Sequence, residues 1–279
     1  MGSIGAFLEN LIRQNRHLKV IELGAEFASF FLKSYWNEGY FEMNKNGEFH
    51  LIRAAQAYFK DQQVTVFDVG ANHGQWSVRL KELLPDSVIH CFEIVPNTFD
   101  ILVEKLAAHK GIVFNNTGLS DVPRELQVTF FTDEDTGSSI QALPWDSPSK
   151  SVACDVVSGD QYCKEHGIDK IDFLKVDTEG HEVSILKGFS ERLKSEKITL
   201  IQFEYGFTYL PPRSTLGDVY DLLSPYGYCI GRLYPKGVEF KPYDFFVDEN
   251  FKMGNYVAVH KSAPSLIQQL SVSGQKYTA

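Results

Sequence analysis

Short apolar runs alternate along this chain with longer segments in which apolar side chains recur every three or four positions. The runs predict buried strands, and the longer segments predict helices with one apolar face. The predicted strands span residues 64–70, 87–95, 111–119, 125–132, 151–158, 171–177 and 198–206. The predicted helices span residues 75–84, 97–110, 159–167, 182–194 and 215–227.

Strands that alternate with helices favour a mostly parallel sheet with helices on both faces. We therefore expect an α/β fold whose doubly wound sheet has seven strands. Residues 228–240 predict a hairpin, and its first strand, with residues 255–261, predicts antiparallel additions at one edge. The chain divides into an N-terminal helical extension (1–45), a main domain (46–262) and a polar, frayed C-terminal tail (263–279).

The N-terminal extension reads as helical from Ile4 to Trp36, with a break near Leu23 and Gly24. Such helices would cap the main domain, pair between subunits of a homodimer, or act as a lid. Residues 38–52 predict a loop or hairpin that turns at Asn46-Gly47.

The composition of the chain argues against some classes of binding partner and favours one type of cellular compartment. The formal net charge is −9, and no strong Lys/Arg run occurs, which argues against nucleic acid and anionic membranes as partners. The four cysteines are scattered without a CxxC pair, as expected in a reducing compartment. The N-terminus lacks the pattern of a signal peptide, and no apolar run approaches the roughly 20 residues of a membrane span. These features predict a cytoplasmic protein.

The segment "VFDVGANHGQWS", Val66 to Ser77, joins the first predicted core strand to a helix through two glycines. In doubly wound sheets, such a turn lies at the edge where ligands bind. Since no Lys-Ser/Thr pair follows Gly74, a P-loop is excluded. The turn also lacks the third glycine of a dinucleotide fingerprint. A plain strand-to-helix connection remains an alternative.

Acidic residues at two strand ends favour a cationic ligand such as S-adenosylmethionine. Asp68 precedes the first glycine, where a carboxylate is poorly placed against a pyrophosphate. Glu93 ends the second strand, where an acidic side chain can accept hydrogen bonds from both ribose hydroxyls. After the third strand, "NNTGLSD" offers small residues and Asp121 for an adenine edge.

These motifs together resemble the FkbM-type methyltransferases within the class I, S-adenosylmethionine-dependent fold. The resemblance covers "NGE" (Asn46–Glu48), "VFDVGANHGQWS", "CFEIVPNTFDIL", "NTGLSD", "TGSSI" (Thr136–Ile140) and "IDFLKVDTEGHEVSILKG". One departure is Ser158-Gly159-Asp160, where the family tends to show a Leu-Asp pair. The resemblance implies a Rossmann-like sheet, and the residues expected to bind the cofactor are Asp68, Gly70, Ala71, Asn72, Gly74, Glu93, Thr117, Gly118 and Asp177.

The string "KVDTEGHE" places chemistry-bearing side chains at the edge of the sheet beside the expected sulfonium. Asp177, Glu179 and His181 are the predicted catalytic residues, and His181 is the candidate base or else a helix-start residue. Glu204 ends the next strand and, with Asp177 and Glu179, forms a candidate Mg²⁺ site. His73 would act through its backbone. Aromatic residues that could line an acceptor pocket or belong to the core are Trp36, Tyr40, Phe41, Tyr205, Phe207 and Tyr209.

We therefore predict an S-adenosylmethionine-dependent methyltransferase that acts on a hydroxyl of a sugar or secondary metabolite. The expected acceptor is a small molecule or a glycan. Two alternatives are an NAD-dependent oxidoreductase on a related sheet and a non-catalytic module that binds an adenosyl ligand. The identity of the acceptor is beyond the sequence.

Overall fold

The computed structural model describes residues 3–131 and 149–272. Contacts within the chain separate two compact units, Met1–Gly39 and Tyr40–Ala279. The small unit contains helices α1 (Ser3–Gln14) and α2 (Lys19–Tyr35). The chain breaks between them at residues 15–18, where Leu18 N–H bonds to Asn15 O, and not near Gly24 as the sequence predicted. Gly24 lies inside α2, because a single glycine costs a helix only about 1 kcal/mol.

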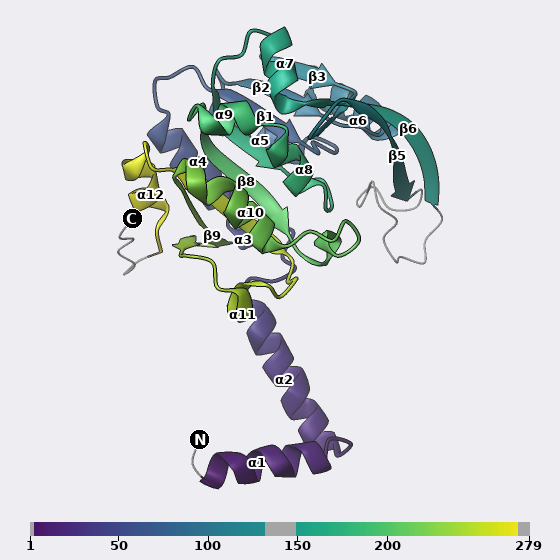
Figure 1. Ribbon diagram of the computed structural model, residues 1–279, viewed down its shortest axis with the longest axis vertical. Coiled ribbons are helices and arrows are strands. Elements are labelled where there is room, and N and C mark those ends of the chain that lie inside the picture. The colour runs from purple at the N-terminus through teal and green to yellow at the C-terminus, as the bar shows by residue number, and fades with distance from the viewer. Residues whose placement is uncertain (1–2, 132–148, 273–279) are drawn as a thin grey trace. The chain divides into compact units, whose positions relative to one another are not determined.

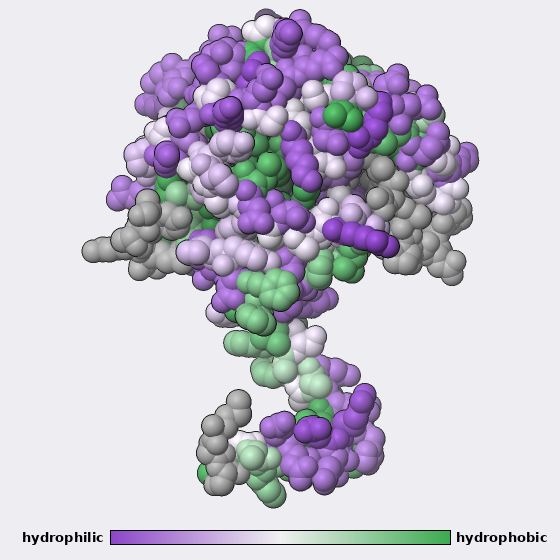
Figure 2. Space-filling model, in the orientation of Figure 1, coloured by the Kyte–Doolittle hydropathy of each residue, from purple (hydrophilic) through white to green (hydrophobic). Residues whose placement is uncertain are grey.

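The helices of the small unit expose large apolar side chains. Figure 2 shows apolar side chains on these helices, whereas the face of the larger unit in this view is mostly hydrophilic. They include Phe7, Leu11, Phe27, Phe30 and Phe31, and α2 has no buried residue. No helix in the described part of the chain combines the length and apolarity required to cross a membrane.

The larger unit contains an eight-stranded sheet in the order β10-β9-β11-β8-β7-β1-β2-β3. Figure 1 shows this sheet among the helices of the larger unit. Its five parallel strands are β3, β2, β1, β7 and β8, and the remaining three pair antiparallel at one edge. The bounds are β1 (Thr65–Val69), β2 (Val88–Phe92), β3 (Ile112–Asn115), β7 (Ile171–Val176), β8 (Ile198–Tyr205), β9 (Tyr228–Tyr234), β10 (Gly237–Phe240) and β11 (Gly254–His260). The doubly wound sheet is confirmed but has eight strands: β11 and both strands of the predicted hairpin extend its edge, whereas the predicted strands at 125–132 and 151–158 belong to a separate sheet.

Helices cover both faces of this sheet, and each face has its own apolar core. One face carries α4 (Glu48–Tyr58), α5 (Gln75–Leu83), α6 (Pro96–Leu106) and α12 (Pro264–Leu270). The other carries α7 (Gly159–Glu165), α8 (Glu182–Lys187), α9 (Ser190–Lys194) and α10 (Leu216–Leu223). Strand β7 is buried along its whole length because both of its faces are covered.

A separate three-stranded sheet has the order β4-β6-β5. It consists of β4 (Gly118–Ser120), β5 (Arg124–Phe131) and β6 (Ser149–Ser158). The predicted strand at 111–119 therefore splits between two sheets, β3 in the large one and β4 in the small one. Short elements complete the unit, namely α3 (Met43–Asn46), η1 (Phe207–Tyr209), η2 (Ser224–Tyr226) and α11 (Phe245–Asp248).

Two segments differ from the sequence-based prediction. Asn46-Gly47 joins α3 to α4 and does not close a hairpin, because the segments on both sides are helices; Gly47 adopts φ +103° between them. A Cβ atom there would lie 2.3 Å from Tyr234 O. Residues 264–270 lie within the predicted polar tail, but they form helix α12, which buries Leu266 and Leu270.

Candidate active site

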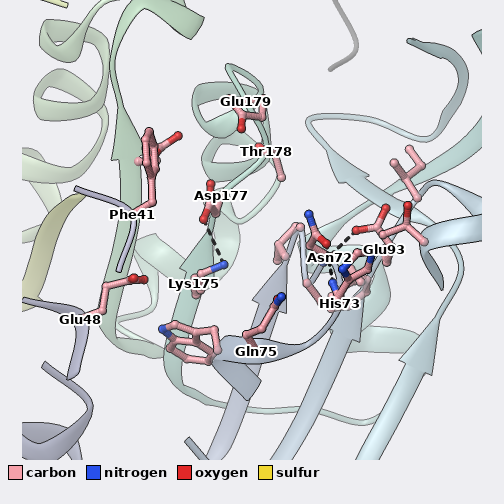
Figure 3. A pocket seen from close by; sticks show the side chains of 18 of the residues that line it. Phe41, Glu48, Asn72, His73, Gln75, Glu93, Lys175, Asp177, Thr178 and Glu179 are labelled. Carbon is pink, nitrogen blue, oxygen red and sulfur yellow. Dashed lines mark hydrogen bonds and ion pairs between the residues drawn. The ribbon is translucent and has the colours of Figure 1, made fainter. Parts of the chain in front are cut away.

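A cavity of about 1060 Å³ opens in the larger unit where β1, β2, β7 and β8 end (Figure 3). Parallel strands present their carboxyl ends on this edge, which is where doubly wound sheets bind ligands. Predicted site residues that line the cavity are Gly70, Ala71, Asn72, His73, Glu93, Thr117, Gly118, Asp177, Glu179, His181 and Glu204. Asp68 and Gly74 do not line it.

The glycine turn uses its own N–H groups to hold its shape. Gly70 and Ala71 both donate to Phe92 O at 3.0 Å, and Gly74 donates to Ala71 O at 2.8 Å. Asn72 N–H donates to Glu93 Oε2 at 2.9 Å, and His73 N–H donates to Asn72 Oδ1 at 2.6 Å. All five N–H groups from residue 70 to residue 74 therefore have acceptors within the protein. A phosphate-binding turn instead aims such N–H groups at its ligand.

Gly70 brings β1 and β7 close together below the cavity. Its φ is +77°, and a Cβ atom there would lie 1.9 Å from Asp177 O. Gly74 packs against α6, since its Cβ atom would lie 2.6 Å from Leu106 Cδ1. The two glycines thus serve close backbone packing, and only Gly70 also lines the cavity.

Glu93 ties the turn to the end of β2. Besides Asn72 N–H, it accepts the N–H of Val95 through Oε1 at 2.9 Å, and its side chain is mostly buried. Burial raises the pKa of Glu93, while the hydrogen bonds from Val95 and Asn72 act in the opposite direction. Each carboxylate oxygen accepts one backbone N–H and keeps a further lone pair for a donor in the cavity.

Asp68 lies behind the cavity wall and is fully buried. It accepts a hydrogen bond from Ser77 Oγ at 2.6 Å and pairs with Lys175 Nζ at 3.3 Å. The two strands place Asp68 and Lys175 side by side in register. Asp68 therefore lies next to the cavity through its partner Lys175, which lines it.

Lys175 is a cavity residue that the sequence analysis did not single out. Its ammonium also lies 3.3 Å from Asp177 Oδ2 and 5.8 Å from the Trp76 ring centroid. Burial by itself would lower the pKa of Lys175, but Asp68, Asp177 and Glu48 outweigh it and raise that pKa. The lysine is therefore charged, and its side chain connects β1 to the carboxylate at the end of β7.

Glu48 is a second cavity residue without a predicted role. Its Oε1 accepts from Gln202 Nε2 and its Oε2 accepts from Asn46 Nδ2, both at 2.7 Å. Burial raises the pKa of Glu48, and nearby Lys175 opposes this. The "NGE" motif thus supplies a buried carboxyl to the cavity wall (Figure 3).

The end of β7 and the end of β8 bring acidic side chains together. Burial, and then Asp177 and Glu182, raise the pKa of Glu179 to about 8. Burial, and then Asp177, Glu179 and Glu182, raise the pKa of Glu204 well above its usual range. Glu179 also has φ +54°, a conformation that non-glycine residues rarely adopt outside functional sites or turns.

These carboxyls do not form a metal site among the described residues. In residues 3–131 and 149–272, no group of three or more His, Cys, Asp or Glu is arranged to hold a metal ion. The proposed Mg²⁺ set of Asp177, Glu179 and Glu204 is included in that result, and we assign it no metal role.

His181 is the N-cap residue of α8, but its side chain makes no capping bond. Its Nε2 lies 2.9 Å from Ser120 Oγ, and the residue lines the cavity. Burial, together with nearby Arg124, lowers the pKa of His181 to about 4, and Asp121 offsets this only in part. The imidazole is therefore neutral at pH 7, so its ring can accept a proton.

The segment after β3 closes the cavity beside Glu93. Asn116 Nδ2 donates to Glu93 O at 2.9 Å, and Thr117 Oγ1 donates to Asp155 O at 2.7 Å. Asp121 was expected at an adenine edge, but it pairs with Arg124 at 2.8 Å and does not line the cavity. Thr136–Ile140, a motif of the resemblance, lies outside the described residues.

Four aromatic candidates of the larger unit divide between the cavity and the core, and Tyr40 is exposed and belongs to neither. Phe41 and Phe207 line the cavity and are exposed at it, whereas Tyr205 and Tyr209 are buried in the core. Lys175 had no sequence signal as a site residue because its role depends on the register of β1 against β7. Glu48 lay in a motif that was noted, and its burial became visible only once α4 was placed.

The fold and its cavity define an α/β protein with a ligand site at the carboxyl edge of a doubly wound sheet. The family described as "Methyltransferase FkbM domain" matches residues 68–230, from the end of β1 to the start of β9. The chain belongs to this family.

Two curated relatives share part of the chain. The hexuronic acid methyltransferase AglP of Haloferax volcanii is 27% identical over 161 residues, covering 57% of this chain and 64% of that protein. The methyltransferase sdnD of Sordaria araneosa is 30% identical over 156 residues, covering 45% of this chain and 60% of that protein. The chain thus spans about three fifths of the length of the curated relatives that it matches.

Solved structures show a more distant similarity. A putative rRNA-methylase from Clostridium thermocellum has a TM-score of 0.45 at 11% identity, covering 77% of this chain and 96% of that one. A SAM-dependent methyltransferase from Aquifex aeolicus has a TM-score of 0.40 at 15% identity, covering 78% and 92%. The fold described above rests on the strand order and not on these similarities.

Proposed function

We propose that the protein is an S-adenosylmethionine-dependent methyltransferase that methylates a hydroxyl group on a sugar or secondary metabolite. Its membership of the FkbM methyltransferase family supports the reaction class. One observation favours this donor over a dinucleotide: the glycine turn has committed all five of its N–H groups to protein acceptors. A pyrophosphate would find no N–H group of residues 70–74 to bind, whereas a cationic ligand needs none.

The chemistry of the cavity wall fits this donor. Asp177 and Glu93 would provide acceptor oxygens for a ligand that carries a sulfonium and an ammonium. Glu93 would accept hydrogen bonds from the ribose hydroxyls, and Thr117 and Gly118 would border the adenine. When bound, S-adenosylmethionine supplies a methyl group on a sulfonium, whose C–S bond keeps its electron pair on sulfur as it breaks.

The residues at the end of β7 would serve the acceptor. Asp177 is held by Lys175, so its remaining oxygen can orient an acceptor hydroxyl. His181 is neutral at pH 7 and would accept the hydroxyl proton as the acceptor oxygen bonds to the methyl carbon. Glu179, whose pKa is raised to about 8, would be protonated at pH 7 and would act as a hydrogen-bond donor.

Calorimetry of the full chain with S-adenosylmethionine and, separately, with NAD tests the choice of donor. We expect binding of the first and none of the second, and the reverse result would contradict the proposal. Incubation with the donor and a panel of sugars and hydroxylated metabolites, with mass detection of a methyl replacing a hydrogen, tests the reaction. Donor binding without transfer to any hydroxyl would instead favour a non-catalytic module.

A further inference from the structure

Ser120 is the residue around which the environment of His181 is organised. Its side chain is fully buried at the end of β4, and its Oγ has three polar neighbours. Asp121 Oδ1 lies at 2.8 Å, His181 Nε2 at 2.9 Å and Arg124 Nη2 at 3.1 Å. A hydroxyl has only one hydrogen to donate, so these three contacts cannot all be donated from Ser120.

The charges of Arg124 and Asp121 determine which of the three contacts uses the hydroxyl hydrogen of Ser120. The Arg124 guanidinium only donates, so its contact occupies a lone pair of Ser120 Oγ. Asp121 is ionised at neutral pH, because the hydrogen bond from Ser120 and the charge of Arg124 lower its pKa despite partial burial, which acts the other way. An ionised carboxylate only accepts, so Asp121 takes the Ser120 hydrogen.

In the contact between Ser120 and His181, Ser120 Oγ must therefore be the acceptor. Since the only hydrogen of Ser120 points at Asp121, His181 Nε2 has to be the donor. A neutral imidazole carries one proton, so Nδ1 is left with its lone pair. No hydrogen bond to Nδ1 occurs among the described residues, and His181 lines the cavity.

We propose that Ser120, oriented by Asp121 and Arg124, is a positioning residue that holds His181 in its Nε2–H tautomer and makes Nδ1 the proton-accepting atom at the cavity. The assignment of the tautomer rests on these contacts and on the charge states of Asp121, Arg124 and His181, and it does not depend on the proposed function. Its consequence for methyl transfer rests on the proposed function. Ser120 itself does not line the cavity.

The tautomer can be read by NMR at pH 7 from two-bond correlations between the ring protons and ring nitrogens of ¹⁵N-labelled histidines. The chain has eight histidines, so the His181 signals are assigned by their loss in His181→Gln. We expect wild-type His181 to show a protonated Nε2 and a bare Nδ1. A bare Nε2 would overturn the proposal.

Asp121→Ala provides the sharper test, because it frees the Ser120 hydrogen to point at Nε2. The Asp121 side chain is partly exposed, so folding should survive the change. We expect the Nδ1–H population of His181 to rise at least severalfold, and an unchanged population would overturn the proposal. Asp169→Ala removes an exposed, ion-paired carboxylate elsewhere and should leave His181 as it is in the wild type.

Kinetics connect the tautomer to turnover. Ser120→Ala should lower kcat for methyl transfer about tenfold or more, while the calorimetric Kd for S-adenosylmethionine changes less than twofold. Ser120→Thr, which keeps the hydroxyl, should restore most of the rate. Loss of donor affinity in parallel with rate would mean a structural role and overturn the positioning role. Absence of any transfer by the wild type would contradict the proposed function, whereas the NMR result would stand by itself.

Discussion

Lys175 Nζ lies 3.3 Å from Asp177 Oδ2, so a buried cation holds the half-exposed carboxylate at the cavity edge. The same ammonium lies 3.3 Å from the fully buried Asp68. The Lys175 ammonium thus pairs with a carboxylate on β1 and with one at the cavity, so the stability of the fold should depend on it.

Replacing Lys175 by Met should destabilise the protein severely. The change leaves Asp68 buried without its cation, and breaking a buried pair in this way costs about 3–5 kcal/mol. Chemical denaturation at pH 7 measures the loss. Lys197→Met removes an exposed ammonium paired with Asp169 and should leave the midpoint unchanged. Equal midpoints for the two variants would contradict the central role of Lys175.

Substitution of Gly70 should separate backbone strain from steric conflict. Gly70 and Gly167 both have positive φ, but only at Gly70 would a Cβ atom strike backbone, 1.9 Å from Asp177 O. Gly167→Ala should cost about 1–2 kcal/mol from strain alone. Gly70→Ala should cost clearly more, as measured by thermal unfolding of both variants. Similar costs would mean that the close approach of β1 to β7 is unimportant.

Glu93→Gln should weaken S-adenosylmethionine binding and leave the fold intact. An amide keeps the shape of the side chain, but one of its ends donates and so opposes the N–H of Asn72 or Val95. Losing a charge-assisted hydrogen bond costs about 1.5–3 kcal/mol, which corresponds to about a 10- to 150-fold rise in Kd. Calorimetry gives the value, with the exposed Glu104→Gln on α6 as the control. An affinity equal to that of the control would remove Glu93 from the donor site.

Stability should fall as pH rises through neutrality because of Glu182. Burial raises its pKa from 4.5 to about 7, although hydrogen bonds, including those from Thr178 and Gly180, oppose this. Between these pH values the folded state keeps a proton that the unfolded state has released, so the contribution is full below pH 4.5 and is lost toward pH 7.

Glu182→Gln removes this titration. Relative to wild type, the variant should gain about 3 kcal/mol of unfolding free energy between pH 4.5 and pH 8. Urea unfolding across this range measures the difference, with the exposed Glu165→Gln on α7 as the reference. A difference that stays flat with pH would show that the folded pKa of Glu182 is not raised.

The sequence predicted most of the framework because strands and helices alternate with clear periods. The same pattern predicted that Glu93, Asp177 and His181 lie at one edge: the first two directly follow strands, and His181 precedes the next helix. Lys175 could not be found in this way, because lysines are mostly exposed and its burial depends on a partner 107 positions away. The ion pair between Asp68 and Lys175 could not be predicted for the same reason, because it depends on the register of β1 against β7.

The break between the two N-terminal helices was predicted at the wrong residues, which shows a second limit of prediction from sequence. Gly24 weakens a helix only slightly, whereas the actual turn at residues 15–18 contains no proline or glycine to mark it. Asn46-Gly47 shows the converse, because a dipeptide typical of hairpins here joins two helices.

In the turn from Gly70 to Gly74, every N–H group already has an acceptor within the protein, and this limits how its cofactor preference could be changed. In many nucleotide-binding folds, cofactor preference can be changed by exchanging side chains around a backbone that already offers its N–H groups. Here the backbone itself would have to be rebuilt, since Phe92 O, Ala71 O, Glu93 and Asn72 already accept those N–H groups. Directed evolution toward a phosphate-bearing cofactor should therefore require insertions or deletions in this turn and should not succeed by point substitution alone.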